Sequence, residues 1–196
     1  MKEILGTVAV ILTFLAYVPY YRDVLSGKTH PHIYSWSLWG LLTALVVALQ
    51  LKGGAGLSAV AVTAAAGLMC VGIVVLSLKH GKKYITVSDT VVAILSLIAI
   101  GFWVFANQPN ISMLLVIVAD ILAFIPTVRK SWHSPHTETL SLYVTNTVRF
   151  SLAFLALREY TFLSASWIVV WVIANFLFSV ILVVRRKQLS STQLTS

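Results

Sequence analysis

The amino-acid sequence predicts an all-α integral membrane protein with seven transmembrane helices, arranged as two parallel three-helix bundles joined by a linker helix. Of its 196 residues, 59% are hydrophobic and only 10% are charged, whereas a soluble domain carries about 25% charged residues. The hydrophobic residues gather in runs that approach the roughly 20 residues needed to cross a bilayer. An internal repeat in the sequence predicts how these runs are grouped.

Seven hydrophobic runs are bounded by charged residues, prolines and glycines, and each predicts one membrane-spanning helix. The runs are residues 4–21, 33–51, 56–78, 86–106, 111–128, 139–157 and 162–184. We interpret the first run as a retained span, because it has no small-residue cleavage site and continues into a tyrosine-rich segment. Seven spans leave no room for a separate soluble domain.

The basic residues predict the orientation of these spans. With seven spans, ten Lys and Arg residues fall on one side of the membrane and three, Lys2, Lys52 and Arg158, on the other. Because short cytoplasmic loops are enriched in basic residues, we expect the N-terminus outside and the C-terminus in the cytoplasm of a plasma (inner) membrane protein. The net charge of +8 is then a signal of topology, so we expect the lipid bilayer and no nucleic acid as a partner. A homo-oligomer is compatible with the sequence.

The internal repeat relates the first and the fifth predicted spans. The segment LAYVPYYR at 15–22 resembles LAFIPTVR at 122–129, and a loop containing His and Pro follows each. The repeat divides the chain into three spans, one unpaired span and three further spans. Because three spans end on the opposite side of the membrane, the unpaired span brings the chain back, so that both triplets have the same orientation. We predict a first bundle at 1–84, a linker helix at 85–107, a second bundle at 108–188 and a cytoplasmic tail at 189–196. Parallel repeats of this kind occur in transporters.

This 3+1+3 plan, with Pro19 and Pro126 near the cytoplasmic end of the first span in each triplet, resembles the SWEET/SemiSWEET and PQ-loop transporter family. The resemblance covers roughly residues 4–187. Where the family has a Pro-Gln dipeptide, this chain has Pro19-Tyr20 and Pro126-Thr127, so both glutamines are absent. Asn175 matches an Asn that SWEET-type proteins place on the third helix of a triplet. The resemblance implies alternating-access transport of sugars or amino acids, and a group of vitamin transporters shares the same plan.

Two charged residues fall near the middle of the predicted spans, Asp120 in 111–128 and Arg149 in 139–157. At about 1.5 Å rise per residue their depths differ by roughly 3 Å on antiparallel helices, so the two side chains could pair. A charge at the centre of a bilayer costs roughly 2.5–3.5 kcal/mol, which predicts that both face the protein interior. Two interpretations stay open: an ion pair that locks the two spans together, or a solute-binding or proton-linked site facing a cavity. The matching positions of the first repeat are Thr13 and Thr43, both neutral, which predicts an asymmetric site.

Other polar and aromatic residues share helical faces with these charges. Asn146 lies three residues before Arg149, Trp171 and Asn175 are spaced i, i+4, and Trp39 and Thr43 form a similar stripe. Sugars suit such surfaces because aromatic rings pack against their C–H faces while amides bond to their hydroxyls. The predicted substrate-binding residues are Asp120, Arg149, Asn146, Asn175, Trp171, Trp39, Thr43 and Thr13. Pro19 and Pro126 are predicted hinges, because a proline removes one hydrogen bond from its helix.

No motif in the sequence predicts an enzyme, a cofactor or a metal site. The last predicted span has no lysine for a retinal Schiff base, HExxH is absent, and no nucleophile–base pair lies within the spans. The loop histidines His30, His32, His133 and His136 have no carboxylate or cysteine at a familiar metal-ligand spacing, so we expect them to be solvated at the membrane interface. The single Cys70 excludes a disulfide framework.

The favoured function is a membrane transporter that moves a small polar metabolite, a sugar first, by alternating access through a central cavity between the two repeats. One alternative is a proton-linked carrier of an amino acid or another zwitterion, for which an acidic and a basic group in one cavity are suited. A vitamin carrier and a non-transporting membrane scaffold or receptor are the remaining alternatives.

Overall fold

The computed structural model describes residues 1–80 and 108–194, together with positions 87, 90, 91, 93, 94, 97 and 105. Within this part of the chain the secondary structure comprises six α-helices and one short 3₁₀-helix, with no strand. The linker helix predicted at 85–107 lies outside the described residues except for the single positions. The seven-helix arrangement therefore stays a prediction.

The six helices coincide with six of the predicted hydrophobic runs. They are α1 (Lys2–Leu25), α2 (Ile33–Lys52), α3 (Leu57–His80), α5 (Pro109–His133), α6 (Leu140–Leu155) and α7 (Phe162–Leu194), with the 3₁₀-helix η2 (Pro135–Thr137) between α5 and α6. Five of them, all except α6, are long and apolar enough to cross a membrane. α6 has 16 residues, which is about 24 Å of helix. These helices are those of a multi-pass membrane protein, and α7 continues to Leu194 through most of the segment expected as a tail.

Local sequence signals explain where several helices begin and end. At the start of α7, the Ser164 amide donates to Thr161 Oγ1 (3.2 Å) and the Thr161 amide donates to Ser164 Oγ (2.9 Å), a reciprocal capping pair. Pro109 begins α5, where its missing N–H leaves no helical bond unmade. α1 ends two residues before Gly27, whose φ of 73° is accessible to glycine at little cost.

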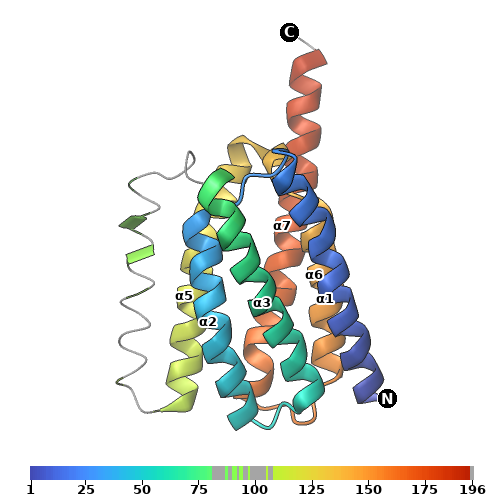
Figure 1. Cartoon of the computed structure of the whole chain (residues 1–196), viewed down its shortest axis with the longest axis vertical. Helices are drawn as coiled ribbons and strands as arrows, with labels where there is room; N and C mark the ends of the chain where they lie inside the picture. The colour runs from blue at the N-terminus through green and yellow to red at the C-terminus, as the bar shows by residue number, and fades with distance from the viewer. Residues whose placement is uncertain are drawn as a thin grey trace.

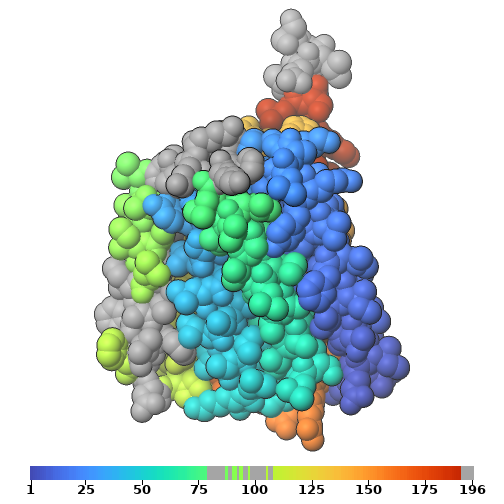
Figure 2. Space-filling view, viewed as in Figure 1, coloured from blue at the N-terminus to red at the C-terminus, as the bar shows by residue number. Residues whose placement is uncertain are grey.

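The helices pack as two similar triplets. In each triplet the third helix contacts the other two, so that α3 lies against α1 and α2 while α7 lies against α5 and α6. Between the triplets, α1 packs on α6 and α5 packs on α2. Exchanging the members of one triplet for those of the other leaves this pattern unchanged, as expected of two repeats. On the face shown in Figure 2, side chains of α1, α2 and α3 fill the spaces between the ribbons of Figure 1.

The pattern of buried positions shows which residue of the first repeat matches which residue of the second, and it corrects one of the matches predicted from the sequence. The pattern of buried positions in α1 recurs in α5, and that of α2 in α6, at an offset of 107, whereas that of α3 recurs in α7 at an offset of 105. Thr13 therefore corresponds to Asp120, as predicted. The counterpart of Arg149 is Leu42, one residue before the predicted Thr43. Both charged residues replace neutral ones in the first repeat.

The two ends of the bundle differ in charge. We call the end with residues 26–32 and η2 the Glu138 end, and the end with the turns at 53–56 and 156–161 the Gly53 end; they are the top and the bottom of Figure 1. The first residues of α1 lie at the Gly53 end, and the last residues of α7 lie at the Glu138 end. Lys2, Lys52 and Arg158 belong to the Gly53 end. The other described basic residues outside the bundle centre belong to the Glu138 end: Arg22, Lys28, Lys79, Arg129, Lys130, Arg185, Arg186 and Lys187. Because basic residues are more numerous at the Glu138 end, the sequence predicts that this end faces the cytoplasm.

Gly6→Ala is expected to destabilise the packing of α1 on α3. A Cβ at Gly6 would lie 2.5 Å from Ser58 Cβ and 3.0 Å from the Ser58 carbonyl carbon, so the two helices must separate. Overpacking of this kind costs about 1–3 kcal/mol. The control Gly40→Ala adds a Cβ 3.6 Å from Cys70 Cβ, an ordinary contact, and gains up to about 1 kcal/mol of helix propensity. Thermal unfolding of the two purified variants in detergent measures the difference, and equal stability would contradict this helix contact.

Candidate functional site

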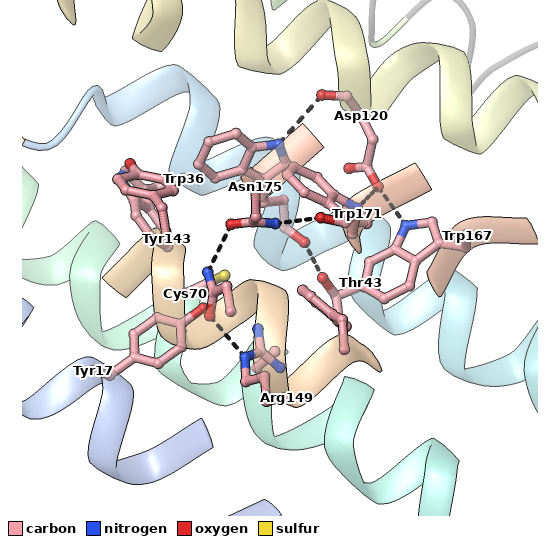
Figure 3. Close-up of a pocket in the computed structure, with 14 residues that line it drawn as sticks. Tyr17, Trp36, Thr43, Cys70, Asp120, Tyr143, Arg149, Trp167, Trp171 and Asn175 are labelled. Carbon is pink, nitrogen blue, oxygen red and sulfur yellow. Dashed lines mark hydrogen bonds between the residues drawn. The ribbon is translucent and has the colours of Figure 1, made fainter. Parts of the chain in front are cut away.

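A cavity of about 40 Å³ lies between the two triplets, and each of the six α-helices contributes to its wall (Figure 3). Half of the side chains around it are aromatic, and the rest include one carboxylate, one guanidinium and two amides. The lining residues are Tyr17, Trp36, Trp39, Thr43, Ala66, Cys70, Asp120, Tyr143, Asn146, Arg149, Phe150, Trp167, Trp171 and Asn175.

The structure brings the predicted binding residues together. Seven of the eight line this cavity: Asp120, Arg149, Asn146, Asn175, Trp171, Trp39 and Thr43. The eighth, Thr13, is fully buried beside Arg149 and accepts a hydrogen bond from its Nη1 at 3.3 Å. Pro19 and Pro126 lie within α1 and α5 and do not line the cavity. The binding role of the eight residues and the hinge role of the two prolines stay predictions.

Asp120 on α5 is held through one oxygen of its carboxylate. Its Oδ2 accepts hydrogen bonds from the indole N–H groups of Trp167 (2.6 Å) and Trp171 (3.2 Å), both on α7. A third indole, from Trp39 on α2, donates to the backbone carbonyl of Asp120 at 3.3 Å. Asp120 Oδ1 is buried and has no hydrogen-bond partner among the described residues. The indoles therefore fix the carboxylate and leave one oxygen to accept a further donor.

Arg149 on α6 is 1% exposed, and neutral groups surround its guanidinium. Its Nε donates to Asn146 Oδ1 at 2.7 Å, on the preceding turn of the same helix. Asn146 is positioned in turn by Asn175, because its Nδ2 donates to Asn175 Oδ1 at 3.1 Å. The guanidinium carbon lies 4.0 Å from the ring centre of Phe150 and 5.9 Å from that of Tyr17, within the range of cation–π attraction. Within the part of the chain that the structure describes, the positive charge is thus stabilised without a counterion.

Asp120 and Arg149 line the same cavity but form no ion pair in the described part of the chain. The hydrogen-bond partners of the two side chains are all neutral, and Figure 3 shows them on different sides of the cavity. Of the two interpretations left open by the sequence, the ion pair that locks the two helices together does not form among the described residues. The reason is that α5 packs on α2 and α7, whereas α6 packs on α1, α3 and α7, so these sequence neighbours do not lie against each other.

Seven cavity residues were not selected from the sequence: Tyr17, Trp36, Ala66, Cys70, Tyr143, Phe150 and Trp167. Trp167 lies one helical turn before Trp171, so extending the Trp171–Asn175 stripe by four residues would have found it. Cys70 is the counterpart of Asn175 at an offset of 105. This offset is visible only in the burial pattern, so the sequence alone could not identify Cys70. Tyr17 gives no sequence signal beyond its place in the repeat.

The expectation that the loop histidines are solvated is wrong for His32. This residue is the N-cap of α2 and is fully buried, with Ser35 Oγ 3.3 Å from its Nδ1. Its loop is covered because the His30 amide donates to the Thr137 carbonyl at 3.0 Å, which joins the two loops of the Glu138 end. Over the residues that the structure describes, no three His, Cys, Asp or Glu side chains gather as a metal site would require.

Comparisons of this chain with models of protein families, with curated proteins and with solved structures find no match. The likeness to SWEET and PQ-loop transporters therefore stays a prediction. The roles of the cavity residues have to be inferred from their geometry.

Trp167→Phe is expected to lower stability through Asp120. The substitution keeps an aromatic ring but removes the 2.6 Å bond to Oδ2, and a hydrogen bond to a charged group is worth about 1.5–3 kcal/mol. In an Asp120→Asn background the same substitution should cost clearly less, because the acceptor is neutral, giving a coupling of about 1 kcal/mol or more. Thermal unfolding of the wild type, both single variants and the double variant measures this coupling. Trp132→Phe, at a half-exposed tryptophan, is the control, and additive losses at 120 and 167 would contradict the contact.

Proposed function

We propose that the chain is a membrane transporter that moves a small polar metabolite by alternating access through the central cavity between its two repeats. One observation supports this most: Asp120 and Arg149 line a single cavity, and among the described residues neither has a counterion there. Removing a charge from water costs several kcal/mol unless a partner compensates for it. A solute with complementary groups would supply such partners. Solute binding therefore explains why two charged residues are buried here, which helix packing alone does not.

The size of the cavity supports a carrier that changes shape during its cycle. An engineered cavity of about 150 Å³ accepts a benzene molecule, whereas this one measures about 40 Å³. The two ends of the bundle are both bridged between the triplets, by His30 N–H to the Thr137 carbonyl and by Arg158 N–H to the Ala55 carbonyl, each at 3.0 Å. This is the geometry expected of an occluded state that must open before a solute enters.

The two charges favour a zwitterion, such as an amino acid, over a neutral sugar. An ammonium group suits the open Oδ1 of Asp120, because carboxylate and indole rings together form a favourable environment for a cation. The carboxylate of the same solute suits Arg149, whose planar guanidinium binds carboxylates well. A neutral sugar would leave both charges without a counterion.

A sugar is the second candidate, and the aromatic lining supports it. Trp39 and Trp171 approach each other edge to face with ring centres 5.5 Å apart, and the Asn146 and Asn175 amides lie on the same cavity. Such rings and amides provide the stacking faces and hydrogen bonds that a sugar needs. The resemblance to SWEET transporters also favours a sugar.

Uptake into proteoliposomes tests the transporter against the scaffold or receptor alternative and ranks the solutes. Radiolabelled L-alanine, D-glucose and thiamine represent a zwitterion, a sugar and a vitamin. The proposal predicts uptake of one class above that of protein-free liposomes, with L-alanine favoured. A pH gradient applied to the same vesicles shows whether the flux is proton-linked, and no uptake from a broad panel of each class would contradict the proposal.

Asp120→Asn and Arg149→Gln are each expected to lower the flux about tenfold or more, since each weakens a charge-assisted contact worth about 1.5–3 kcal/mol. Arg158→Gln, at an exposed arginine of the Gly53 end, is the matched control and should transport normally. The exchanged variant Asp120→Arg, Arg149→Asp should not recover flux, because the indole donors of Trp167 and Trp171 would then face another donor. Full flux in either single variant or in the exchanged variant would contradict a binding role.

A further inference from the structure

The Glu138 end is closed by a buried polar cluster, the Glu138 latch, formed by Glu138, Lys130, Tyr20 and Tyr143. Glu138 Oε1 pairs with Lys130 Nζ, and the two side chains are 0% and 7% exposed. Glu138 Oε2 accepts hydrogen bonds from the hydroxyls of Tyr143 (2.9 Å) and Tyr20 (3.3 Å). Both oxygens of this carboxylate are therefore satisfied, in contrast to those of Asp120.

The Glu138 latch joins the two repeats. Tyr20 belongs to α1, Lys130 to α5 and Tyr143 to α6, while Glu138 lies between η2 and α6. Lys130 Nζ also donates to the backbone carbonyl of His30, in the loop between α1 and α2. Breaking these bonds is a requirement for separating the two triplets at this end.

The same cluster holds two residues of the cavity wall. Tyr143 lines the cavity and donates to Glu138 directly. Trp36 also lines the cavity, and its Nε1 donates to the Tyr20 hydroxyl at 3.1 Å, which in turn donates to Glu138. Trp36 and Tyr143 are counterparts at the repeat offset of 107. Moving Trp36 or Tyr143 away from the cavity at this end therefore requires bonds of this cluster to break.

The Gly53 end is closed in a different way. Besides the Arg158 to Ala55 backbone bond, Thr161 Oγ1 donates to the Gly53 carbonyl at 3.0 Å. A Cβ on Gly53 would lie 2.5 Å from Leu163 Cβ, so the two turns are in close contact there. Among the described residues the buried ion pair occurs only at the Glu138 end. A buried pair loses much of its stability when one partner is removed, so Glu138 is the side chain whose change should weaken this end most. Two further contacts join the triplets here, the His30 to Thr137 backbone bond and the contact of 2.6 Å between Thr29 Oγ1 and Thr139 Oγ1.

We propose that the Glu138 latch is the gate of the cavity at this end: the cavity opens to the Glu138 side when Glu138 releases Lys130, Tyr20 and Tyr143. The role of this gate rests on the proposed function, because a cavity that opens to one side is useful only if a solute passes through it. Its test requires no solute, so the gate and the transport activity succeed or fail separately.

Cys70 provides the readout, because it is the only cysteine of the chain and lines the cavity. The experiment measures how fast a membrane-impermeant methanethiosulfonate reagent modifies Cys70 of the full-length protein, in membrane vesicles of both orientations. Wild type should react slowly, since Cys70 is buried. Glu138→Gln, which keeps the size of the side chain but removes its charge, should react about tenfold faster or more from the Glu138 side alone, as expected when a buried pair is broken.

Glu159→Gln makes the same chemical change at an exposed position of the Gly53 end and should react like the wild type. Cys70→Ser should not react at all, which shows that the signal comes from the cavity. Tyr143→Phe removes a single hydrogen bond from Glu138 and should therefore accelerate the modification of Cys70 less than Glu138→Gln does. If Glu138→Gln does not fold, Tyr143→Phe takes its place in the experiment. An unchanged rate in a folded latch variant, or an equal increase from both sides of the membrane, would overturn the gate.

Discussion

A charged side chain buried among apolar helices must be compensated by neighbouring groups, and this constraint organises the polar interior of the molecule. Glu138 is fully compensated, by Lys130 and two tyrosine hydroxyls. Among the described residues, Asp120 has donors on one oxygen only, and Arg149 has neutral acceptors and aromatic rings but no anion. The two buried acids therefore differ: both oxygens of Glu138 have partners, whereas Asp120 keeps one oxygen without a hydrogen-bond partner among the described residues.

Much of the fold follows from the sequence, because apolar runs and their boundaries locate membrane helices directly. Six of the seven predicted spans correspond to described helices. Charge near the middle of a span and helical spacing together selected seven residues that share one cavity. The ion pair between Asp120 and Arg149 could not be judged this way, since the sequence does not tell which helices lie side by side. The Glu138 latch was missed for a similar reason, because Tyr20 and Glu138 are 118 positions apart.

The repeat explains why the cavity is asymmetric. The charged and amide side chains of the cavity come from the second triplet, and none of their counterparts in the first carries a charge or an amide. Asp120, Arg149, Trp167, Trp171 and Asn175 correspond to Thr13, Leu42, Val62, Ala66 and Cys70. Trp36 and Trp39 of the first triplet instead provide aromatic rings. A solute in such a cavity would meet unlike walls and be held in one orientation, which suits a molecule whose own ends differ.

The most direct test of the central claim is whether the cavity binds a solute through Asp120. Thermal unfolding of the purified protein, measured with L-alanine, glycine, D-glucose, sucrose and thiamine, detects binding as a rise in unfolding temperature, because a ligand that binds only the folded state stabilises it. The account predicts that at least one of these compounds, with the zwitterions favoured, stabilises the wild type and loses most of that effect with Asp120→Asn. Equal stabilisation of the wild type and a folded Asp120→Asn variant would contradict it.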